Sequence, residues 1–133
     1  MLVYPDTCVL IYLIEEHPSL APQVESAIRA APTLCFALSE LLRLECRVSP
    51  MKQGDFALLA KFDRFFSNAT HIFIPASRQV FNLATEFRVQ HQLKTPDALH
   101  LAFAIHAGCD AFWTNDRHLE KAASGRIKLL TFQ

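Results

Sequence analysis

Glycine is scarce in this chain of 133 residues, which contains only three. A nucleotide-binding Rossmann domain needs a Gly-x-Gly-x-x-Gly turn, and three scattered glycines cannot supply it. The four cysteines, Cys8, Cys35, Cys46 and Cys109, form no Cys-x-x-Cys pair and have no histidine at a metal-binding spacing. The sequence therefore argues against a dinucleotide site, a zinc site and a thioredoxin-like motif, and it indicates reduced, buried thiols.

An excess of charge of either sign is also absent, because Lys and Arg total 13 and Asp and Glu total 13. No global positive field draws in nucleic acid, so RNA binding would need a local basic patch. Hydrophobic residues make up 51% and charged residues 20%, a composition typical of folded rather than disordered chains. This length fits one compact domain, 1–133, with no room for a second catalytic domain.

Long apolar runs are missing as well, and none reaches the length needed to span a bilayer. The chain passes from Met1 directly into the strand-like segment Leu2-Val3-Tyr4, without the basic region of a signal peptide. We therefore expect a cytoplasmic protein with no membrane attachment.

What the sequence does contain is an alternation of short apolar segments with longer segments of helical period. This pattern is typical of βαβ units, and we predict an α/β fold with a mainly parallel sheet of five strands flanked by helices. The predicted strands are 2–4, 33–37, 71–74, 111–114 and 127–132, the last at a sheet edge. We expect Pro50 and Gly54 to bracket a turn, and the predicted helices are 7–15, 23–30, 39–48, 55–67, 77–91, 96–107 and 116–123.

Two acids follow predicted strands directly. Asp6 comes after the first strand and Asp116 after the fourth. In open α/β sheets the ligand crevice lies beyond the carboxyl ends of the strands, so these two side chains can meet there. Taken singly, each also suits the N-cap of the following helix.

Glu45 interrupts an apolar stripe, because Leu38, Leu41, Glu45 and Val48 follow the spacing of one helix face. Burying a carboxylate is costly unless a cation or hydrogen-bond donors compensate it. Glu45 therefore indicates either a metal or an ion pair with an arginine, unless its side chain reaches out to solvent. Glu40, at the start of the same helix, is explained by the helix dipole and is left out of the site.

Asp97 repeats this anomaly on another helix, where it shares an inward face with His100, Leu101 and Ala104. Thr95-Pro96-Asp97 is also a good helix start, which explains an acid but not an inward one. We expect His100 to be a hydrogen-bonded packing residue rather than a metal ligand.

With these residues in hand, the chain resembles a PIN domain, and most of all the VapC-type ribonuclease toxins of toxin-antitoxin pairs. The order and spacing of the matching segments cover nearly the whole chain: Asp6-Thr7-Cys8-Val9-Leu10-Ile11-Tyr12-Leu13, Ser39 with Glu45, Thr95-Pro96-Asp97-Ala98-Leu99-His100-Leu101-Ala102, and Thr114-Asn115-Asp116. The resemblance implies a catalytic, metal-binding pocket of four acids, Asp6, Glu45, Asp97 and Asp116. It also implies four polar residues around them that orient a carboxylate or a water, namely Thr7, Ser39, Thr114 and Asn115.

The chain departs from the family pattern in two places. Cys8 stands where members commonly carry Asn, and it reads as a small core residue. Some members add an acid shortly after the last motif, but here Asp116 is followed by Arg117 and His118. A fifth ligand at Glu120 is therefore unsupported.

Clustered carboxylates repel one another, and a divalent cation would neutralise them. Mg²⁺ or Mn²⁺ suits an all-oxygen set, keeps several waters and bridges to a phosphate. We expect a metal-activated water to attack in line while one acid takes its proton and one or two metals stabilise the charge on phosphorus. The resemblance further implies an RNA substrate, a cognate antitoxin protein and a homodimer.

Four basic residues lie near the motifs, Arg43, Arg47, Lys94 and Arg117. They either hold the phosphate backbone or are ordinary surface charges.

Two other functions are weighed against the nuclease. A phosphoacceptor receiver domain needs two adjacent acids after the first strand, and only Asp6 is present there. A PIN-like scaffold that has lost catalysis is the binding-class alternative, and the presence of all four acids argues against it.

Overall fold

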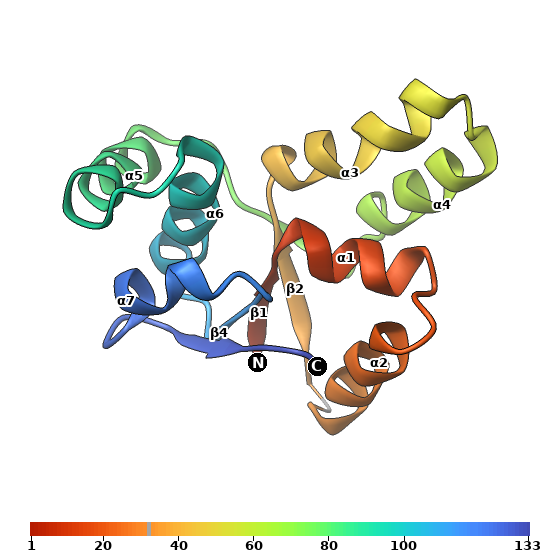
Figure 1. Cartoon of the computed structure of the whole chain (residues 1–133), viewed down its shortest axis with the longest axis horizontal. Helices are drawn as coiled ribbons and strands as arrows, with labels where there is room; N and C mark the ends of the chain where they lie inside the picture. Colours follow the sequence, from red (N-terminus) through yellow and green to blue (C-terminus); the bar gives the residue numbers. More distant parts are fainter. Residues whose placement is uncertain (32) are drawn as a thin grey trace.

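Five parallel strands form one sheet in the computed structural model, which describes residues 1–31 and 33–133. The strand order is β3-β2-β1-β4-β5, so β5 is an edge strand as predicted (Figure 1). Both the α/β class and the five-stranded parallel sheet are confirmed. The strands are β1 (Leu2–Pro5), β2 (Cys35–Leu38), β3 (Ile72–Phe73), β4 (Ala111–Trp113) and β5 (Lys128–Leu130).

The direction of winding reverses at β1. From β1 the chain builds β2 and β3 on one side and then returns to place β4 and β5 on the other. Tyr4 is in register with Phe112 and Pro5 with Trp113, so β1 and β4 end at the same level. Such a reversal point is where open α/β sheets form a ligand crevice at the carboxyl ends of the strands.

The described residues form seven α-helices and one short 3₁₀ helix. In Figure 1, α1 to α4 lie on one side of the central strands, and α5 to α7 lie on the other. Within the described part of the chain, no helix combines the length and apolarity needed to cross a membrane. The helices are α1 (Thr7–Ile14), α2 (Leu20–Ala30), α3 (Glu40–Gln53), α4 (Phe56–Phe66), α5 (Arg78–His91), α6 (Thr95–His106), η1 (Arg117–Leu119) and α7 (Glu120–Ala123).

The central strands are buried on both faces, as expected for a parallel sheet covered by helices. Val3, Tyr4, Phe112 and Trp113 have at most 1% of their surface exposed. The Tyr4 ring lies nearly parallel to those of Phe112 and Phe103, with ring centroids 5.4 and 6.4 Å away. Aromatic packing therefore fixes the end of β1, next to the predicted site.

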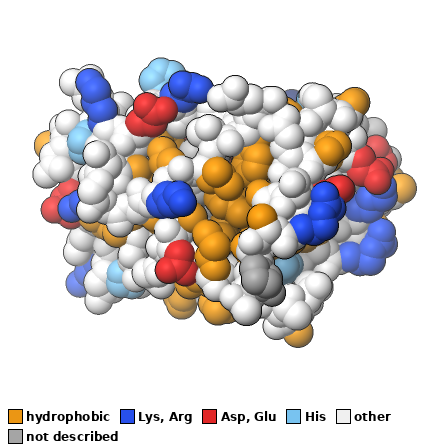
Figure 2. Space-filling view, turned by 90° about the horizontal axis from the view of Figure 1, so that it is seen from below, with side chains coloured by type: hydrophobic (Ala, Val, Ile, Leu, Met, Phe, Trp, Pro, Cys, Tyr) orange, Lys and Arg blue, Asp and Glu red, His pale blue; other side chains and the backbone are white. Residues whose placement is uncertain are grey.

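The two ends of the sheet differ in chemistry. Figure 2 views the molecule from below in Figure 1, the end where the strands begin, and hydrophobic side chains occupy the centre of that face. Acidic and basic side chains lie around them. Two of the acids predicted to form the site, Asp6 and Asp116, follow the opposite, carboxyl ends of β1 and β4.

The prediction of a turn starting at Pro50 was wrong. Helix α3 continues through Pro50 to Gln53, five residues beyond the predicted end at Val48. Pro50 is buried, so packing of its ring outweighs the cost of a proline inside a helix, about 3 kcal/mol. Gly54 does end the helix, in the left-handed conformation with φ of 69°.

Other boundaries also differ from those predicted. Helix α2 begins at Leu20, three residues early, and β2 runs from Cys35 to Leu38 instead of 33–37. The segment 116–123 is not one helix, because a 3₁₀ turn over Arg117–Leu119 precedes α7. The Asp116 side chain caps this turn by accepting the His118 N–H at 2.9 Å.

Candidate active site

Four acids from four separate elements line one cavity of about 390 Å³. The first follows β1, the second lies in α3, the third in the first turn of α6, and the fourth follows β4. They are the acids singled out from the sequence, Asp6, Glu45, Asp97 and Asp116, and the other lining residues are Thr7, Cys8, Ile11 and His100. The fold therefore brings the predicted acids together at the reversal point of the sheet.

Asp6 is the most buried of the four, with 8% of its surface exposed. One carboxylate oxygen accepts the Thr7 N–H at 2.8 Å, and the other accepts the Thr114 hydroxyl at 2.7 Å. Its own N–H donates to the Trp113 carbonyl at 2.8 Å. Asp6 is thus the N-cap of α1 and a wall of the cavity at once, and β4 holds it in place.

Glu45 lies beside the buried face of α3. The predicted stripe was partly wrong, because Val48 is 52% exposed and the buried residues of this helix are Leu42, Cys46 and Pro50. The side chain of Glu45 is 27% exposed and points into the boundary between α3 and α6. Its partner is therefore a histidine of α6 and not the arginine considered from the sequence.

One oxygen of the Glu45 carboxylate receives two hydrogen bonds. Oε1 accepts the Thr7 hydroxyl at 2.6 Å and contacts His100 Nε2 at 2.5 Å. Burial by itself raises the pKa of Glu45, but the hydrogen bonds from His100 and Thr7 outweigh it and leave the pKa lowered. Glu45 is therefore held as a carboxylate.

Asp97 has the opposite electrostatic environment. Burial raises its pKa, and the charges of Asp116, Asp6 and Glu45 raise it further, against a smaller opposing effect of His100. The face that it shares with His100, Leu101 and Ala104 does look inward, since those three are buried. The four acids thus form one electrostatic cluster, in which the charges of the other three favour the protonated form of Asp97.

Asp116 lies at the solvent side of the cavity. Its Oδ1 accepts the His118 N–H at 2.9 Å and lies 3.0 Å from His118 Nδ1. The His118 side chain is 93% exposed, so this ion pair is screened by water. The Asp116 N–H donates to the Thr114 hydroxyl oxygen at 3.0 Å, which links Asp116 to Asp6 through one threonine.

The four polar residues predicted around the acids divide into two groups. Thr7 and Thr114 hydrogen-bond to acids directly. Ser39 caps α3 through the Leu42 N–H at 3.2 Å and contacts no acid. The side-chain oxygen of Asn115 accepts the Phe132 N–H at 2.7 Å and so fastens the C-terminal segment.

The predicted basic residues are also divided by the fold. Lys94 lines a second cavity of about 540 Å³ with His91, His118 and two of the acids, Asp97 and Asp116, so the two cavities adjoin. Arg117 is exposed on η1.

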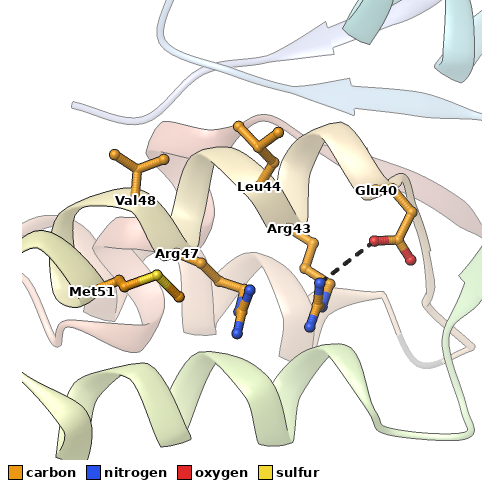
Figure 3. Close-up of a pocket in the computed structure, with 6 residues that line it drawn as sticks. All are labelled: Glu40, Arg43, Leu44, Arg47, Val48 and Met51. Carbon is orange, nitrogen blue, oxygen red and sulfur yellow. Dashed lines mark ion pairs between the residues drawn. The ribbon is translucent and has the colours of Figure 1, made fainter.

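Arg43 and Arg47 lie elsewhere, along an α3 surface with Glu40, Leu44, Val48 and Met51 (Figure 3). Arg43 pairs there with Glu40 at 3.8 Å, and Arg47 pairs with Asp63 of α4 at 2.8 Å. The exclusion of Glu40 from the acid cavity is therefore confirmed.

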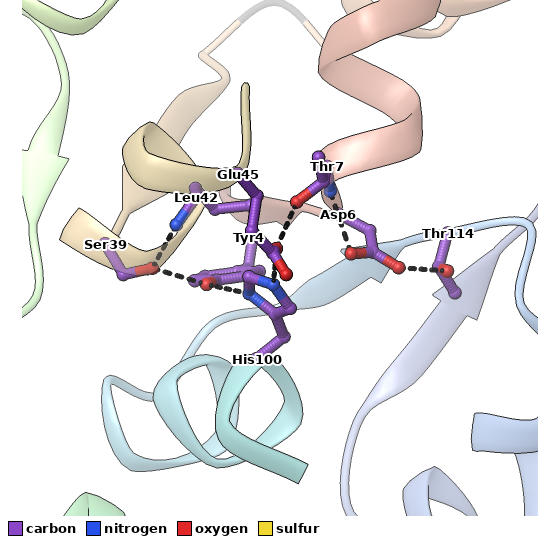
Figure 4. A network of polar contacts seen from close by, with 8 residues as sticks. All are labelled: Tyr4, Asp6, Thr7, Ser39, Leu42, Glu45, His100 and Thr114. Carbon is purple, nitrogen blue, oxygen red and sulfur yellow. Dashed lines mark hydrogen bonds and ion pairs between the residues drawn. The ribbon is translucent and has the colours of Figure 1, made fainter. Parts of the chain in front are cut away.

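A buried chain of hydrogen bonds runs from the start of α3 to Glu45 (Figure 4). The Tyr4 hydroxyl lies 2.7 Å from Ser39 Oγ and 2.7 Å from His100 Nδ1. His100 is 2% exposed and both of its ring nitrogens are engaged, which confirms it as a hydrogen-bonded packing residue. Sequence reasoning missed Tyr4, although a tyrosine in a buried strand needs a partner for its hydroxyl.

The donor set suits a hard divalent cation, but it is not a ready-made cage. Among residues 1–31 and 33–133, no group of three or more His, Cys, Asp or Glu side chains is close enough to hold an ion as it stands. Mg²⁺ usually binds through one or two carboxylates and completes its shell with waters and substrate phosphates. The carboxylate lining and the raised pKa of Asp97 fit that mode of binding. All four cysteines are free, with Cys46 and Cys109 buried and the other two half-buried.

Comparison with known proteins identifies the family of the chain. Residues 3–125 match the family model of the PIN domain. No protein of curated function matches the sequence.

Three solved structures have the same fold along almost the whole chain. VapBC2 from Rickettsia felis, bound to a DNA fragment from its promoter, is 18% identical with a TM-score of 0.80 and 100% of each chain covered. A toxin-antitoxin complex from Klebsiella pneumoniae is 23% identical, with a TM-score of 0.74 and coverage of 97% and 96%. VapC20 from Mycobacterium tuberculosis, described as a sarcin-ricin loop cleaving toxin, is 13% identical, with a TM-score of 0.75 and coverage of 95% and 97%.

Proposed function

The chain belongs to the PIN-domain family, and from that premise we propose that it is a metal-dependent ribonuclease that acts as the toxin of a toxin-antitoxin pair. One observation carries the proposal: carboxylates from four elements line a single cavity at the carboxyl ends of β1 and β4. Such a cavity suits hydrolysis of a phosphodiester, whose transition state gathers negative charge that a cation must offset.

Asp6, Glu45, Asp97 and Asp116 would hold Mg²⁺ or Mn²⁺. When bound, the cation would activate a water molecule and stabilise the charge that develops on the phosphate. Thr7 and Thr114 fix the carboxylates of Asp6 and Glu45 by hydrogen bonds, so those two acids are oriented in advance.

Asp97 is the acid that we assign to the proton of the attacking water. Its raised pKa makes it a better proton acceptor than Glu45, whose pKa is lowered. The carboxylate of Asp97 has no hydrogen-bond donor among the described residues, so it is free to turn toward a water in the cavity.

RNA is the substrate class that we propose. The cavity beside Asp97 and Asp116 extends to Lys94, His91 and His118, which offer positive or proton-donating groups to a phosphate backbone. The similar VapC20 is described as a sarcin-ricin loop cleaving toxin, which supports a single-stranded loop, whose bases can be splayed out, as the cleaved element. We propose that the protein acts on such RNA in the cytoplasm.

We further propose that an antitoxin covers the apolar surface of α3. Leu44, Val48 and Met51 are each more than half exposed there, and Arg43 and Arg47 lie on the same helix (Figure 3). Similar structures include toxin-antitoxin complexes, which supports a protein partner. The apolar face of an amphipathic helix would match this exposed apolar surface. We also expect the toxin to form a homodimer, which light scattering of the purified protein would test.

Induced expression tests the proposed function. Wild-type protein should arrest growth and fragment cellular RNA, whereas Asp97→Asn should do neither. Glu25→Gln is the matched control, because it removes an exposed carboxylate on α2, away from the cavity, and should behave like wild type. Equal growth of cells expressing wild type and Asp97→Asn, at equal protein levels, would contradict the toxin function.

Antitoxin binding needs a separate test. In cells that co-express the antitoxin, Val48→Asp should restore growth arrest while the purified variant cleaves RNA at the wild-type rate. Continued protection by the antitoxin would exclude the α3 surface as its binding site.

A further inference from the structure

We infer that Tyr4 and His100 are positioning residues that aim Glu45, through a chain of hydrogen bonds with one direction. The chain runs from Ser39 through Tyr4 and His100 to Glu45 Oε1 (Figure 4). The role in catalysis rests on the proposed function, whereas the direction of the chain is a property of the protein alone.

Burial favours one arrangement of the protons in this hydrogen-bond chain. Ser39 and Tyr4 have no exposed surface, and His100 has 2%. These groups have almost no surface open to solvent, and a buried donor without an acceptor costs about 1–3 kcal/mol. The arrangement of protons that satisfies every donor is therefore strongly favoured.

The direction follows from counting donors and acceptors. Ser39 Oγ already accepts the Leu42 N–H, and among the described residues its own hydroxyl proton has only the Tyr4 oxygen as an acceptor. Once Ser39 donates to Tyr4, the Tyr4 hydroxyl must donate to His100 Nδ1. His100 then carries its proton on Nε2 and donates it to Glu45.

The reverse arrangement leaves a donor without a partner. If His100 donated from Nδ1 to Tyr4, Tyr4 would donate to Ser39, and the Ser39 proton would point at no acceptor among the described residues. Ser39 therefore sets the tautomer of His100 from two hydrogen bonds away. This also gives Ser39 a role although it contacts no acid.

The consequence for the site is an oriented carboxylate. His100 and Thr7 both donate to Oε1, and no described residue donates to Oε2 of Glu45. Because Glu45 lines the cavity, the second oxygen is left for a ligand there. Glutamate has three rotatable side-chain bonds, so two donors on one oxygen, from α1 and α6, remove freedom that would loosen the site.

The hydrogen-bond chain is itself held by rigid parts of the molecule. The Tyr4 ring lies against Phe112 and Phe103 in the core, and Ser39 is the N-cap of α3, the helix that carries Glu45. Tyr4 on β1, Ser39 before α3 and His100 on α6 therefore join three elements around one carboxylate.

Tyr4→Phe tests the positioning role, because it removes one hydroxyl and keeps the ring. We expect kcat for RNA cleavage to fall by about 10- to 100-fold and half-saturation by Mg²⁺ to move to higher concentration. KM for RNA should stay within about threefold, since Tyr4 itself does not line the cavity and acts there only through His100 and Glu45. Tyr12→Phe is the control, because Tyr12 is the other tyrosine of the protein and takes no part in these hydrogen bonds. This variant should keep the wild-type kcat.

The ¹⁵N NMR signals of the histidine rings test the direction of the chain without RNA or metal. His100 is assigned as the signal missing from a His100→Gln sample, and in the wild type it should show a proton on Nε2 and none on Nδ1. This measurement does not use Tyr4→Phe, so it remains decisive if that variant does not fold.

Each failure has a distinct meaning. Protein with the expected tautomer but no cleavage of RNA would contradict the proposed function and leave the direction of the chain intact. A proton on Nδ1, or a Tyr4→Phe protein that folds and keeps the wild-type kcat and Mg²⁺ dependence, would overturn the inference.

Discussion

Replacing Asp97 by asparagine separates two explanations for an acid at the start of α6. As an acid in the first turn of the helix, Asp97 stabilises the protein through its charge at the positive end of the helix dipole, by about 0.3–1 kcal/mol. As a member of the acid cluster, it destabilises the metal-free protein by repelling Asp6, Glu45 and Asp116. Asparagine keeps the shape and removes the charge, so the sign of the change in stability identifies the larger effect.

The pKa of Asp97 is raised, which indicates that repulsion and burial outweigh the helix dipole. A carboxyl group whose pKa is raised by folding disfavours the folded state above that pKa, and the cost disappears as the pH falls through the folded-state value. The difference between wild type and Asp97→Asn should therefore be greatest at neutral pH and should shrink in acid.

The magnitude follows from the charges and their exposure. At an effective dielectric constant of about 20, two unit charges repel by about 4 kcal/mol at 4 Å and by about 2 kcal/mol at twice that distance. Asp97 is half-buried, and solvent reduces such interactions toward the range of exposed pairs, about 0–1 kcal/mol each. After subtraction of the lost dipole interaction, the net gain for Asp97→Asn is on the order of 1 kcal/mol, or roughly 3–5 °C in Tm.

Thermal melts of both proteins, with chelator and with millimolar Mg²⁺, measure this difference. The metal-free variant should melt above metal-free wild type. Mg²⁺ should raise the Tm of wild type more than that of the variant, because a ligand of the folded state stabilises in proportion to the logarithm of its concentration over Kd. An Asp97→Asn protein that is destabilised equally in both buffers would refute the reasoning and leave Asp97 with only a helix-dipole role in the first turn of α6.

Three further predictions concern single side chains. Glu45→Gln should lower the free energy of unfolding at pH 7 by on the order of 1 kcal/mol in urea titrations, because the pKa of Glu45 is lowered on folding. This loss should vanish as the pH falls through the pKa of folded Glu45, and a loss that persists in acid would contradict the prediction. Phe62→Ala, at a fully buried position, should cost about 3–5 kcal/mol by the same assay, and a cost below 1 would contradict its place in the core. Burial raises the pKa of Cys109 to about 12, so its thiol should react with a disulfide reagent at pH 8 only after denaturation, and rapid labelling of the native protein would show otherwise.

The sequence indicated the acids in two ways, by their positions after strands and by acidic residues on inward helix faces. Asp6 and Asp116 follow strands, and parallel strands bring their carboxyl ends to one edge, so their meeting could be predicted without coordinates. Asp97 shared an inward face with residues that are buried in the structure. Glu45 was found through a stripe that was only partly right, since Val48 is exposed.

What the sequence could not predict depends on contacts between distant elements. The Tyr4 hydroxyl meets Ser39 and His100 only after β1, α3 and α6 are assembled, and no spacing along the chain encodes that meeting. Pro50 continues a helix because its ring is buried, although its local propensity predicts a break. Local chemistry thus located the carboxylates, and tertiary packing determined how they are held.

The central claim is that the four acids perform metal-dependent hydrolysis, and cleavage of a single-stranded RNA by the purified protein tests it most directly. Cleavage should require Mg²⁺ or Mn²⁺, stop in chelator, and return when the metal is restored. Asp97→Asn in the same assay should lose activity by at least about 100-fold, as expected when a group that acts in the transition state is removed. Cleavage that is undiminished in chelator, or equal in wild type and Asp97→Asn, would contradict the account.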